Sequence, residues 1–578
     1  MIRPGYRFGM RQPATRIRLV FSLPAQLSFH DLDVWIQEAL ESDVKDYQPI
    51  FIGNQSTDTP QEKYLIRLLY VTTILLQDIR VPVFERAAIV QIEVNRKQPD
   101  AYLAEIWFPI VEAFPIDGFH AWICIANELI ANLCQLITNP SALEDLYQTF
   151  QKKYVLPWSR RIPGAKSTIP ILQAAFELGI PFAHLASGRY ILGWGCQSRL
   201  FERSINIFDS AIGAVATQNK DLALAIMHFA GIPVPKGRTC KVGESLSLAT
   251  LKELKLPLVV KPVDKDRGEG VSLGIKTEEA LQNAFQEVAK ISRAALVEEQ
   301  VAGTCHRILV VDGKVVYVVK RHPKGIIGDG MSSVEVLVKQ MNDIIRKKIP
   351  LKRLPEIQLD AQAIDCLKEA GLDAHSVPKP GQKVPLRPAQ STVWGGDPED
   401  VTQDLHPDNA EIAIRVAALF GLTCAGVDFI STDISIPWHQ NGAVINEVNF
   451  APVIGRTHAF QRNAARAYLD KIFPTKGKIP VEIFIGESNK QAAINRWYQL
   501  TGAGKNAFMC HEEAILKPNS KKLFLAGEQS NYECLTMLRA DKNVDAIVVH
   551  CSDMNFFAYN GWPAEEVRIH NSVGARND

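Results

Sequence analysis

The chain has 578 residues, with 47% hydrophobic and 22% charged residues and a formal net charge of +1. This length suits about three or four domains of ordinary size. With this near-neutral charge, nothing indicates a nucleic acid or a membrane surface as the main partner, and we expect neither. Ten cysteines without CxxC pairs, no signal-like start and no long apolar span indicate a reduced, cytoplasmic setting. The 13 histidines form no HExxH motif and no cluster with cysteine, so we expect no zinc site.

The first part of the chain alternates two kinds of pattern. Strand-like runs occupy residues 16–23 (RIRLVFSL) and 87–94 (AAIVQIEV), and we interpret residues 101–114 (AYLAEIWFPIVEAF) as helical. A segment rich in proline and arginine follows at 155–167. We therefore predict an α/β N-terminal domain over residues 1–160.

Residues 161–475 alternate apolar strands with amphipathic helices and carry the phosphate-type motifs of the chain. A new strand opens at 478–486 (KIPVEIFIG), and about a hundred residues follow it. We predict a central catalytic domain over 161–475 and a small terminal domain over 476–578. The fold class is α/β.

A lysine and a glycine loop are the first chemical feature of the central domain. Lys261 ends a predicted strand, and Gly268 and Gly270 follow in the loop before the next strand. Glycines let backbone N–H groups approach an anion closely, which favours a phosphate cradle. No GKS or GKT follows, so this is not a Walker loop, and an ordinary hairpin turn remains the alternative.

Two neighbouring segments carry acidic residues inside apolar runs. Asp428 lies in 424–432 (CAGVDFIST), and Glu447 and Asn449 lie two apart in 442–456 (GAVINEVNFAPVIGR). Side chains at i and i+2 of a strand share a face, and the turn-rich segment between the runs predicts a hairpin. Paired antiparallel, the three residues converge as oxygen donors, for which Mg2+ is the natural occupant. A partly exposed edge hairpin is the alternative interpretation.

Several ordered motifs resemble one known family. They are Lys220 with GIPVPKG, VVKP with the glycine loop, VEEQV with CHRILVVDGKVV, GVDF, and NEVNFAP. This order is similar to that of ATP-grasp ligases, and to the ATP-grasp half of cyanophycin synthetases in particular. The resemblance covers residues 165–475 strongly and the earlier part weakly. It implies an ATP-grasp fold, flanked by the α/β N-terminal domain.

The resemblance also implies roles for individual residues. Transfer of the γ-phosphate of ATP to a carboxylate would give an acyl phosphate, which an amine attacks to form an amide. Positioning and charge neutralisation dominate such chemistry. ATP and Mg2+ are the implied cofactors. The residues implied for the ATP phosphates are Lys220, Lys261, Gly268 and Gly270, and those implied for the adenine slot are Glu298, Glu299 and Val301. Mg2+ would be bound by Asp428, Glu447 and Asn449. The residues implied for catalysis are Arg307, Arg456 and Lys261.

The chain departs from the family pattern at three places. Cys305 stands where the family has an acid that contacts ribose, and its lack of an activating partner makes it inert rather than catalytic. The glycine loop reads Asp-Arg-Gly-Glu-Gly at 266–270. The acceptor loop at 389–402 (AQSTVWGGDPEDVT) contains extra residues, including Trp394, so its substrate can differ. For Arg307 and Arg456 a surface or ion-pair role is the alternative.

The C-terminal segment resembles the start of a Mur-ligase-like domain with a broken phosphate loop. Gly486 and Lys490 remain, but Asn489, Gln491 and Ala492 replace the second glycine and the hydroxyl residues that would bind Mg2+. The GxGK of 501–508 lacks a following Ser or Thr, and we interpret it as a turn. A truncated, non-catalytic domain is therefore expected, useful for packing or oligomer contacts.

One working ATP-grasp site is the pattern of the single-site, type 2 cyanophycin synthetases, which join β-aspartyl-arginine dipeptides. We expect a small peptide or amino acid as substrate and a homo-oligomer, a dimer or a tetramer. The alternatives are an ATP-grasp ligase for another amino acid or dipeptide, and a catalytically weak paralogue that acts as a binding subunit.

Overall fold

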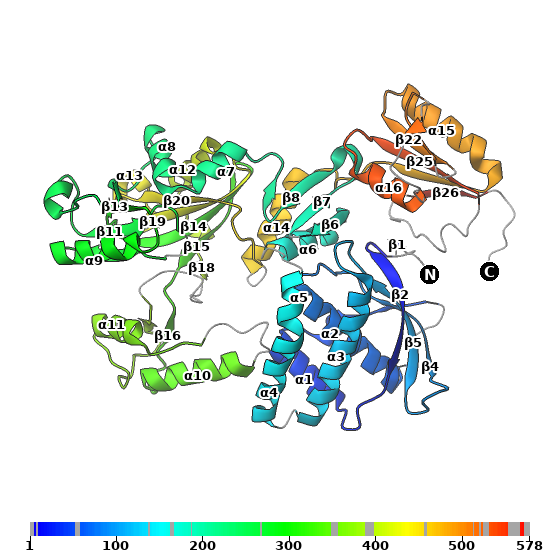
Figure 1. The fold of residues 1–578 in the computed structure, drawn as a ribbon, viewed down its shortest axis with the longest axis horizontal. Coiled ribbons are helices and arrows are strands. Elements are labelled where there is room, and N and C mark those ends of the chain that lie inside the picture. The colour runs from blue at the N-terminus through cyan, green and yellow to red at the C-terminus, as the bar shows by residue number, and fades with distance from the viewer. Residues whose placement is uncertain are drawn as a thin grey trace. The chain divides into compact units, whose positions relative to one another are not determined.

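The structure is a computed structural model that describes residues 5–6, 10–52, 58–136, 139–161, 167–186, 188–265, 269–347, 356–387, 398–455, 459–511, 514–519, 522–523, 531–552 and 567–571. Helices and strands alternate along the chain, so the fold is mixed α/β as predicted (Figure 1). Two compact units form. One contains Met1–Arg203, Lys347–Arg353 and Leu469–Asp578, and the other contains Ser204–Arg346 and Leu354–Tyr468. The boundaries near residues 160 and 475 remain predictions.

The N-terminal part of the first unit is a sheet in the order β1-β2-β5-β4-β3 with helices against one face (Figure 1). Residues of β2 alternate between buried and exposed, as in Ile17 and Arg18, which matches a sheet with one covered face. The elements are β1 (Gly5–Tyr6), β2 (Pro13–Phe21), α1 (Phe29–Leu40), β3 (Ile50–Phe51), α2 (Pro60–Asp78), β4 (Ala88–Val94), β5 (Tyr102–Pro109), α3 (Ile116–Leu136), α4 (Pro140–Phe150) and α5 (Leu156–Arg161).

The helical interpretation of residues 101–114 is wrong. Residues Tyr102–Pro109 form β5, which pairs antiparallel with β2 on one side and with β4 on the other. Side chains of both faces of β5 are buried or half-buried, Glu105 included, so its sequence lacks the clear alternation that marks a half-exposed strand. Pairing with β2 and β4 therefore determines that this segment is a strand.

The first unit also contains a small antiparallel sheet and the C-terminal elements. In the C-terminal part, β22, β25, β21 and β26 run parallel within a sheet ordered β24-β23-β22-β25-β21-β26. The elements are α6 (Thr168–Leu178), β6 (Phe182–Ala186), β7 (Arg189–Leu192), β8 (Arg199–Glu202), β21 (Val481–Ile485), α15 (Lys490–Gly502), β22 (Ala507–His511), β23 (Ala514–Leu516), β24 (Lys522–Leu523), α16 (Asn531–Ala540), β25 (Ala546–Cys551) and β26 (Val567–Asn571).

Two antiparallel sheets form the framework of the second unit. One has the order β10-β13-β11-β12 and the other has the order β18-β15-β14-β19-β20. Their strands are β10 (Gly237–Lys241), β11 (Leu258–Pro262), β12 (Ser272–Ile275), β13 (Ala294–Glu299), β14 (Thr304–Val311), β15 (Lys314–Arg321), β18 (Pro398–Asp400), β19 (Cys424–Ser431) and β20 (Val444–Phe450).

Helices and a small β pair complete the region around these sheets. Helix α8 begins at Lys220 because the side chain of Asn219 caps it, accepting a hydrogen bond from the backbone N–H of Leu222. The elements are α7 (Ala211–Thr217), α8 (Lys220–Phe229), α9 (Glu278–Ala289), β16 (Gly325–Ile327), α10 (Val334–Lys347), α11 (Ala361–Glu369), β17 (Lys383–Pro385), α12 (Pro407–Leu419), α13 (Trp438–Asn441), β9 (Ile205–Asn206) and α14 (Ala459–Ile472).

Each sheet of the second unit has an apolar core on one face. Leu258, Val260 and Val297 pack with α9 in one cluster, and Ile308, Val427 and Ile445 pack with α12 in another. The opposite face of the β18-β15-β14-β19-β20 sheet carries polar residues, among them Arg307, Asp428 and Glu447. Among the described helices, none is both long enough and apolar enough to span a bilayer.

Candidate nucleotide and metal site

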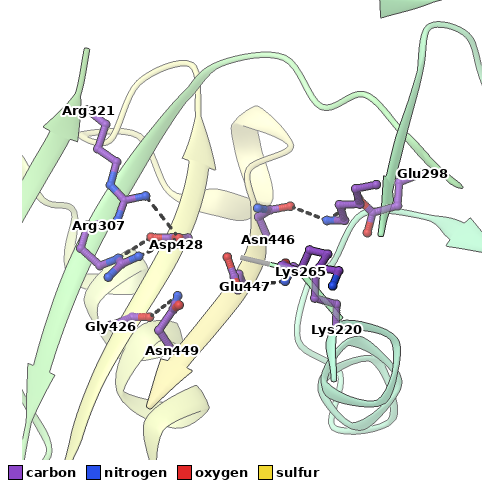
Figure 2. Close-up of polar contacts among 11 residues, drawn as sticks. Lys220, Lys265, Glu298, Arg307, Arg321, Gly426, Asp428, Asn446, Glu447 and Asn449 are labelled. Atoms are coloured by element: carbon purple, nitrogen blue, oxygen red, sulfur yellow. Dashed lines mark hydrogen bonds and ion pairs between the residues drawn. The ribbon is translucent and has the colours of Figure 1, made fainter. Parts of the chain in front are cut away.

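The polar face of β19 and β20 is the centre of the site. The strands pair antiparallel, as the hairpin pattern predicted, with Asp428 opposite Glu447 and Gly426 opposite Asn449. Asn449 hydrogen-bonds the backbone carbonyl of Gly426 at 3.3 Å and also lies within hydrogen-bonding reach of the Asp428 carboxylate. The three residues therefore lie on one face, as Figure 2 shows.

A β-bulge adds a fourth polar residue to this face. Asp428 pairs with Glu447 while the next residue, Phe429, pairs with Ile445, so Asn446 is an extra residue of β20. The buried positions of β20 accordingly fall three apart, at Ile445 and Val448. The bulge lets the neighbours Asn446 and Glu447 both reach the lysines of the site (Figure 2).

Two arginines hold the Asp428 carboxylate. Arg307 of β14 donates from Nε to Oδ1 at 2.5 Å and from Nη2 to Oδ2 at 2.9 Å, and Arg321 of β15 reaches Oδ2 at 3.5 Å. Burial alone would raise the pKa of Asp428, but the charges of the two guanidinium groups lower it below its usual value. Asp428 is thus a fixed anion.

Glu447 has the opposite electrostatic setting. Burial and the neighbouring charge of Asp428 raise its pKa, although Lys220 lies 3.6 Å away. Lys220 also donates to the backbone carbonyl of Lys265, at the start of the glycine loop. The first turn of α8, the loop and β20 therefore meet at this lysine.

Lys261 links the two sheets. Its ammonium group is 2.7 Å from Glu298 Oε2 and donates to Asn446 Oδ1 at 3.2 Å, and its side chain is only 8% exposed. Burial raises the pKa of Glu298, and the charge of Lys261 opposes that shift. Glu298 Oε1 is buried and has no hydrogen-bond partner among the described residues. A buried acceptor of this kind suits a ligand that carries N–H groups.

The other residues expected to bind the nucleotide lie around this pair. Glu299 is the neighbour of Glu298 on β13. Its Oε1 accepts a hydrogen bond from the backbone N–H of Lys255 at 3.1 Å. Val301 lies two residues after Glu299 and is partly buried. Gly270 has a φ of +70°, and a Cβ there would lie 2.7 Å from Ile291 Cδ1, so both conformation and space require glycine.

Some predicted features lie outside the described residues. They include Arg456, Gly268 and the loop segment 388–397 with Trp394. Glu399, which follows that segment on β18, lies 2.5 Å from His322 Nε2 and 3.7 Å from Lys383 Nζ. The hydrogen bond from His322 lowers the pKa of Glu399. Its negative charge is therefore already matched by groups of the protein.

Cys305 lies on the same face of β14 as Arg307. Burial, followed by the charge of Asp428, raises its pKa to about 12. The thiol therefore stays protonated at neutral pH, in line with the inert role expected from the sequence.

Two contributors to the site were missed from the sequence. No motif in the sequence singles out Arg321. It is the last residue of β15, which pairs with β14, the strand that carries Arg307. Asn446 was missed because the i, i+2 rule places it on the opposite face, and only the bulge reverses that. The Asn446–Glu447 pair in the motif was the available signal.

The donor set fits a hard divalent cation. Asp428, Glu447 and Asn449 offer oxygen atoms from one face, which is the ligand type that Mg2+ prefers. A cation beside them would offset the repulsion that raises the pKa of Glu447. Lysines from two other elements and two arginines surround this set, so the site has the character of one that binds phosphate groups together with a divalent cation.

The chain is similar in sequence to cyanophycin synthetases. It is 34% identical to the cyanophycin synthetase of Nostoc sp. over 333 residues, 56% of this chain and 37% of that protein. It is 30% identical to the enzyme of Geminocystis herdmanii over 377 residues, 63% of this chain and 43% of that protein. The chain therefore spans less than half the length of these relatives. The glutathione biosynthesis bifunctional protein GshAB of Clostridium perfringens is 32% identical over 275 residues, 46% of this chain and 35% of that protein.

Likeness to solved structures is weaker. A bifunctional glutathione synthetase from Pasteurella multocida has a TM-score of 0.42 and 22% identity, covering 62% of this chain and 52% of that one. A D-alanine–D-alanine ligase from Bacillus anthracis has a TM-score of 0.30 and 16% identity, covering 46% of this chain and 69% of that one. No protein-family model matches the chain.

Proposed function

We propose that this protein is an ATP-dependent carboxylate–amine ligase that forms amide bonds through an acyl phosphate. The observation that carries the proposal is the polar face of β19 and β20, where Asp428, Glu447 and Asn449 lie together beside buried or partly buried lysines and arginines. The similarity to cyanophycin synthetases over 333 residues supports the same class of reaction.

The reaction has two steps. A carboxylate oxygen of the first substrate attacks the γ-phosphorus of ATP, and ADP leaves with the electrons of the broken P–O bond. The amine of the second substrate then attacks the carbonyl carbon of the acyl phosphate. The C–O bond to phosphate breaks, inorganic phosphate leaves, and the amine nitrogen loses a proton as the amide forms.

The residues of the site have roles that suit these steps. Lys220 and Lys261 supply positive charge for the phosphate chain of ATP, and their positions are fixed by bonds to Lys265 and Asn446. Arg307 and Arg321 would neutralise charge on the transferred phosphoryl group or on the carboxylate. No nucleophilic side chain is needed, because positioning and charge carry the catalysis.

Asp428, Glu447 and Asn449 would hold Mg2+. When bound, the cation supplies charge neutralisation at the phosphate oxygens. The two arginines orient the Asp428 carboxylate without using all its lone pairs, since each carboxylate oxygen can accept more than one bond. Arg456 and Gly268 stay proposed members of the site on the resemblance alone.

We further propose β-aspartyl-arginine dipeptides as the substrate, joined into a polymer or a shorter product. The support is the similarity to cyanophycin synthetases, together with the altered phosphate loop after β21. Glu399, which lies in the acceptor loop, is engaged by His322 and Lys383, so its charge adds no support for a cationic dipeptide. A homo-oligomer and a cytoplasmic location remain predictions.

The test combines substrate screening with product analysis. ADP release is measured with Mg2+ and ATP in the presence of β-aspartyl-arginine, of free aspartate plus arginine, and of a panel of other dipeptides, and the products are weighed by mass spectrometry. We expect turnover with β-aspartyl-arginine and a product ladder spaced by one dipeptide unit. The variants Glu447→Gln and Asp428→Asn should lose this turnover while keeping the fold.

Each other outcome has a defined meaning. A product built from another dipeptide, with no such ladder, would reject the substrate and keep the ligase. An absence of ADP release with every substrate would favour the weak paralogue that acts as a binding subunit. Full turnover in Glu447→Gln would overturn the metal assignment.

A further inference from the structure

Two histidines lie together in the C-terminal part of the chain, in the first unit. His511 ends β22, and His550 lies near the end of the neighbouring parallel strand β25, directly opposite it in the register. Their Nδ1 atoms are 3.0 Å apart, and the ring centroids are 4.9 Å apart. The sequence expectation of no zinc site rested on spacing along the chain, whereas these histidines are 39 residues apart.

The protonation of His550 follows from its other nitrogen. Nε2 lies 3.1 Å from the backbone carbonyl oxygen of Gly486, which follows β21 on the other side of β25. A carbonyl only accepts, so Nε2 carries a proton, and neutral His550 has a lone pair on Nδ1 that faces His511. A backbone carbonyl that fixes the tautomer in this way is typical of histidines that bind metals.

The spacing of the two nitrogens suits one metal ion. With nitrogen–zinc distances of about 2.0–2.1 Å, nitrogens at this separation subtend an angle of about 95° at the metal. An ideal tetrahedral angle would require a separation of about 3.3 Å, which is only about 0.3 Å more than the separation of the two nitrogens here. His550 is 1% exposed and is thereby fixed in place.

The position in the fold also suits a ligand. Both histidines lie at the carboxyl ends of parallel strands, the edge where open α/β sheets bind their ligands. Over the described residues, no third His, Cys, Asp or Glu completes a set of three metal ligands. The remaining coordination positions are left to oxygen ligands outside this pair, and imidazole nitrogens favour Zn2+ and similar transition metals over Mg2+.

We propose that His511 and His550 form a two-histidine site for a transition-metal ion, with Zn2+ as the probe, at the C-terminal edge of this sheet. The site is separate from the ligase site and does not depend on the proposed function. The competing arrangement is a simple hydrogen bond in which His511 Nδ1–H donates to His550 Nδ1.

The test measures Zn2+ binding to the full-length chain. Metal-free protein is titrated with Zn2+ against a chromophoric chelator, in the presence of excess Mg2+, for the wild type, His511→Gln, His550→Gln and the control His375→Gln. His375 has an 85% exposed side chain and lies in the other unit. We expect the wild type and His375→Gln each to bind one more equivalent of Zn2+ than His511→Gln and His550→Gln. Zn2+ should raise the melting temperature of the wild type and of His375→Gln only.

X-ray absorption of the Zn2+-loaded wild type gives a readout that does not depend on the folding of any variant. Two imidazole nitrogens with oxygen ligands support the site. Sulfur ligands, equal binding by the wild type and His511→Gln, or no binding by the wild type would each overturn it, and the last result would leave the hydrogen bond as the arrangement.

Discussion

Lys261 and Glu298 form the most buried ion pair of the candidate site. Their side chains are 8% and 3% exposed, and burial already raises the pKa of Glu298 despite the adjacent ammonium. Replacing a buried ion pair by neutral groups often costs little, but removing one partner leaves a buried charge without compensation. Stability and catalysis can therefore be separated at this pair.

We expect Lys261→Met to lower ADP formation by on the order of a hundredfold or more, because a fixed positive charge at the phosphates is lost. We also expect the free energy of unfolding to fall by about 3 kcal/mol, because Glu298 is left unpaired. The double variant Lys261→Met, Glu298→Gln should recover most of the stability and none of the activity. Urea unfolding and ADP release measure the two effects, and recovery of activity in the double variant would contradict the role of Lys261.

The setting of Glu447 predicts how the stability of the protein depends on pH. Its pKa is raised by burial and by the charge of Asp428, so the folded state disfavours the ionised carboxylate. The resulting destabilisation develops as pH rises above the unfolded pKa, is complete above the folded pKa, and disappears as pH falls. We expect Glu447→Gln to raise the free energy of unfolding of metal-free protein at about pH 8, with a smaller gain at about pH 5.

The control for this prediction is Glu411→Gln, which changes an exposed glutamate of α12 and should leave stability unchanged at both pH values. Chemical unfolding with a chelator present is the measurement. A loss of stability in Glu447→Gln at about pH 8 would show that its contact with Lys220 outweighs the repulsion from Asp428.

At the scale of elements, the pairing of strands decides which side chains meet. The hairpin and the shared face of Asp428, Glu447 and Asn449 followed from the two-residue period of a strand and were predictable. The place of Asn446 depends on the bulge, and that of Arg321 on the pairing of β15 with β14. Neither follows from the pattern within a single strand, because both depend on the register between one strand and its neighbour.

The same reasoning explains β5. Its second face carries Leu103, Glu105 and Trp107, which are buried or half-buried, so the strand shows no clean alternation of apolar and polar residues that would distinguish it from a buried helix. The N-terminal α/β class was nevertheless predictable, since β2 and β4 carried strand patterns.

A substitution at Gly426 of β19 tests how closely the Arg307 side chain packs against this strand. A Cβ at this position would lie 2.9 Å from Nη1 and 3.1 Å from Cδ of Arg307, and 3.1 Å from Cβ of Pro452. We expect Gly426→Ala to displace the Arg307 guanidinium from Asp428 and to lower ADP formation by about tenfold, a barrier increase of about 1.4 kcal/mol.

Gly502→Ala is the matched control, because a Cβ at Gly502, at the end of α15, meets nothing within 4 Å. It should leave activity unchanged and stability unchanged or raised by up to about 1 kcal/mol. Enzyme kinetics and thermal unfolding of both variants are the measurements. Equal activity of Gly426→Ala and the wild type would show that the position of Arg307 is unimportant.

At the scale of the molecule, the chemistry that we propose lies in one of the two units. Lys220, Lys261, Arg307, Asp428 and Glu447 all belong to the second unit. The C-terminal part of the first unit keeps the strand–loop–helix order of a phosphate loop in β21, Gly486 and α15, and Gly504 lies in a turn as expected. Its sequence lacks the second glycine and the hydroxyl residues of such a loop.

We expect Lys490→Ala, at the start of α15, to leave the rate of ADP formation unchanged, since this loop cannot hold a nucleotide and its Mg2+. Lys261→Met provides the comparison in the same assay. A loss in Lys490→Ala as large as that in Lys261→Met would reveal a second working site.

The most direct test of the central claim follows an oxygen atom. The carboxyl groups of β-aspartyl-arginine, or of whichever carboxylate supports ADP release, are labelled with heavy oxygen, and the phosphate formed is analysed by mass spectrometry. An acyl phosphate transfers one labelled oxygen from the carboxylate to each phosphate released, so our account predicts labelled phosphate in the wild type and none in Glu447→Gln. Amide product accompanied by unlabelled phosphate would contradict it.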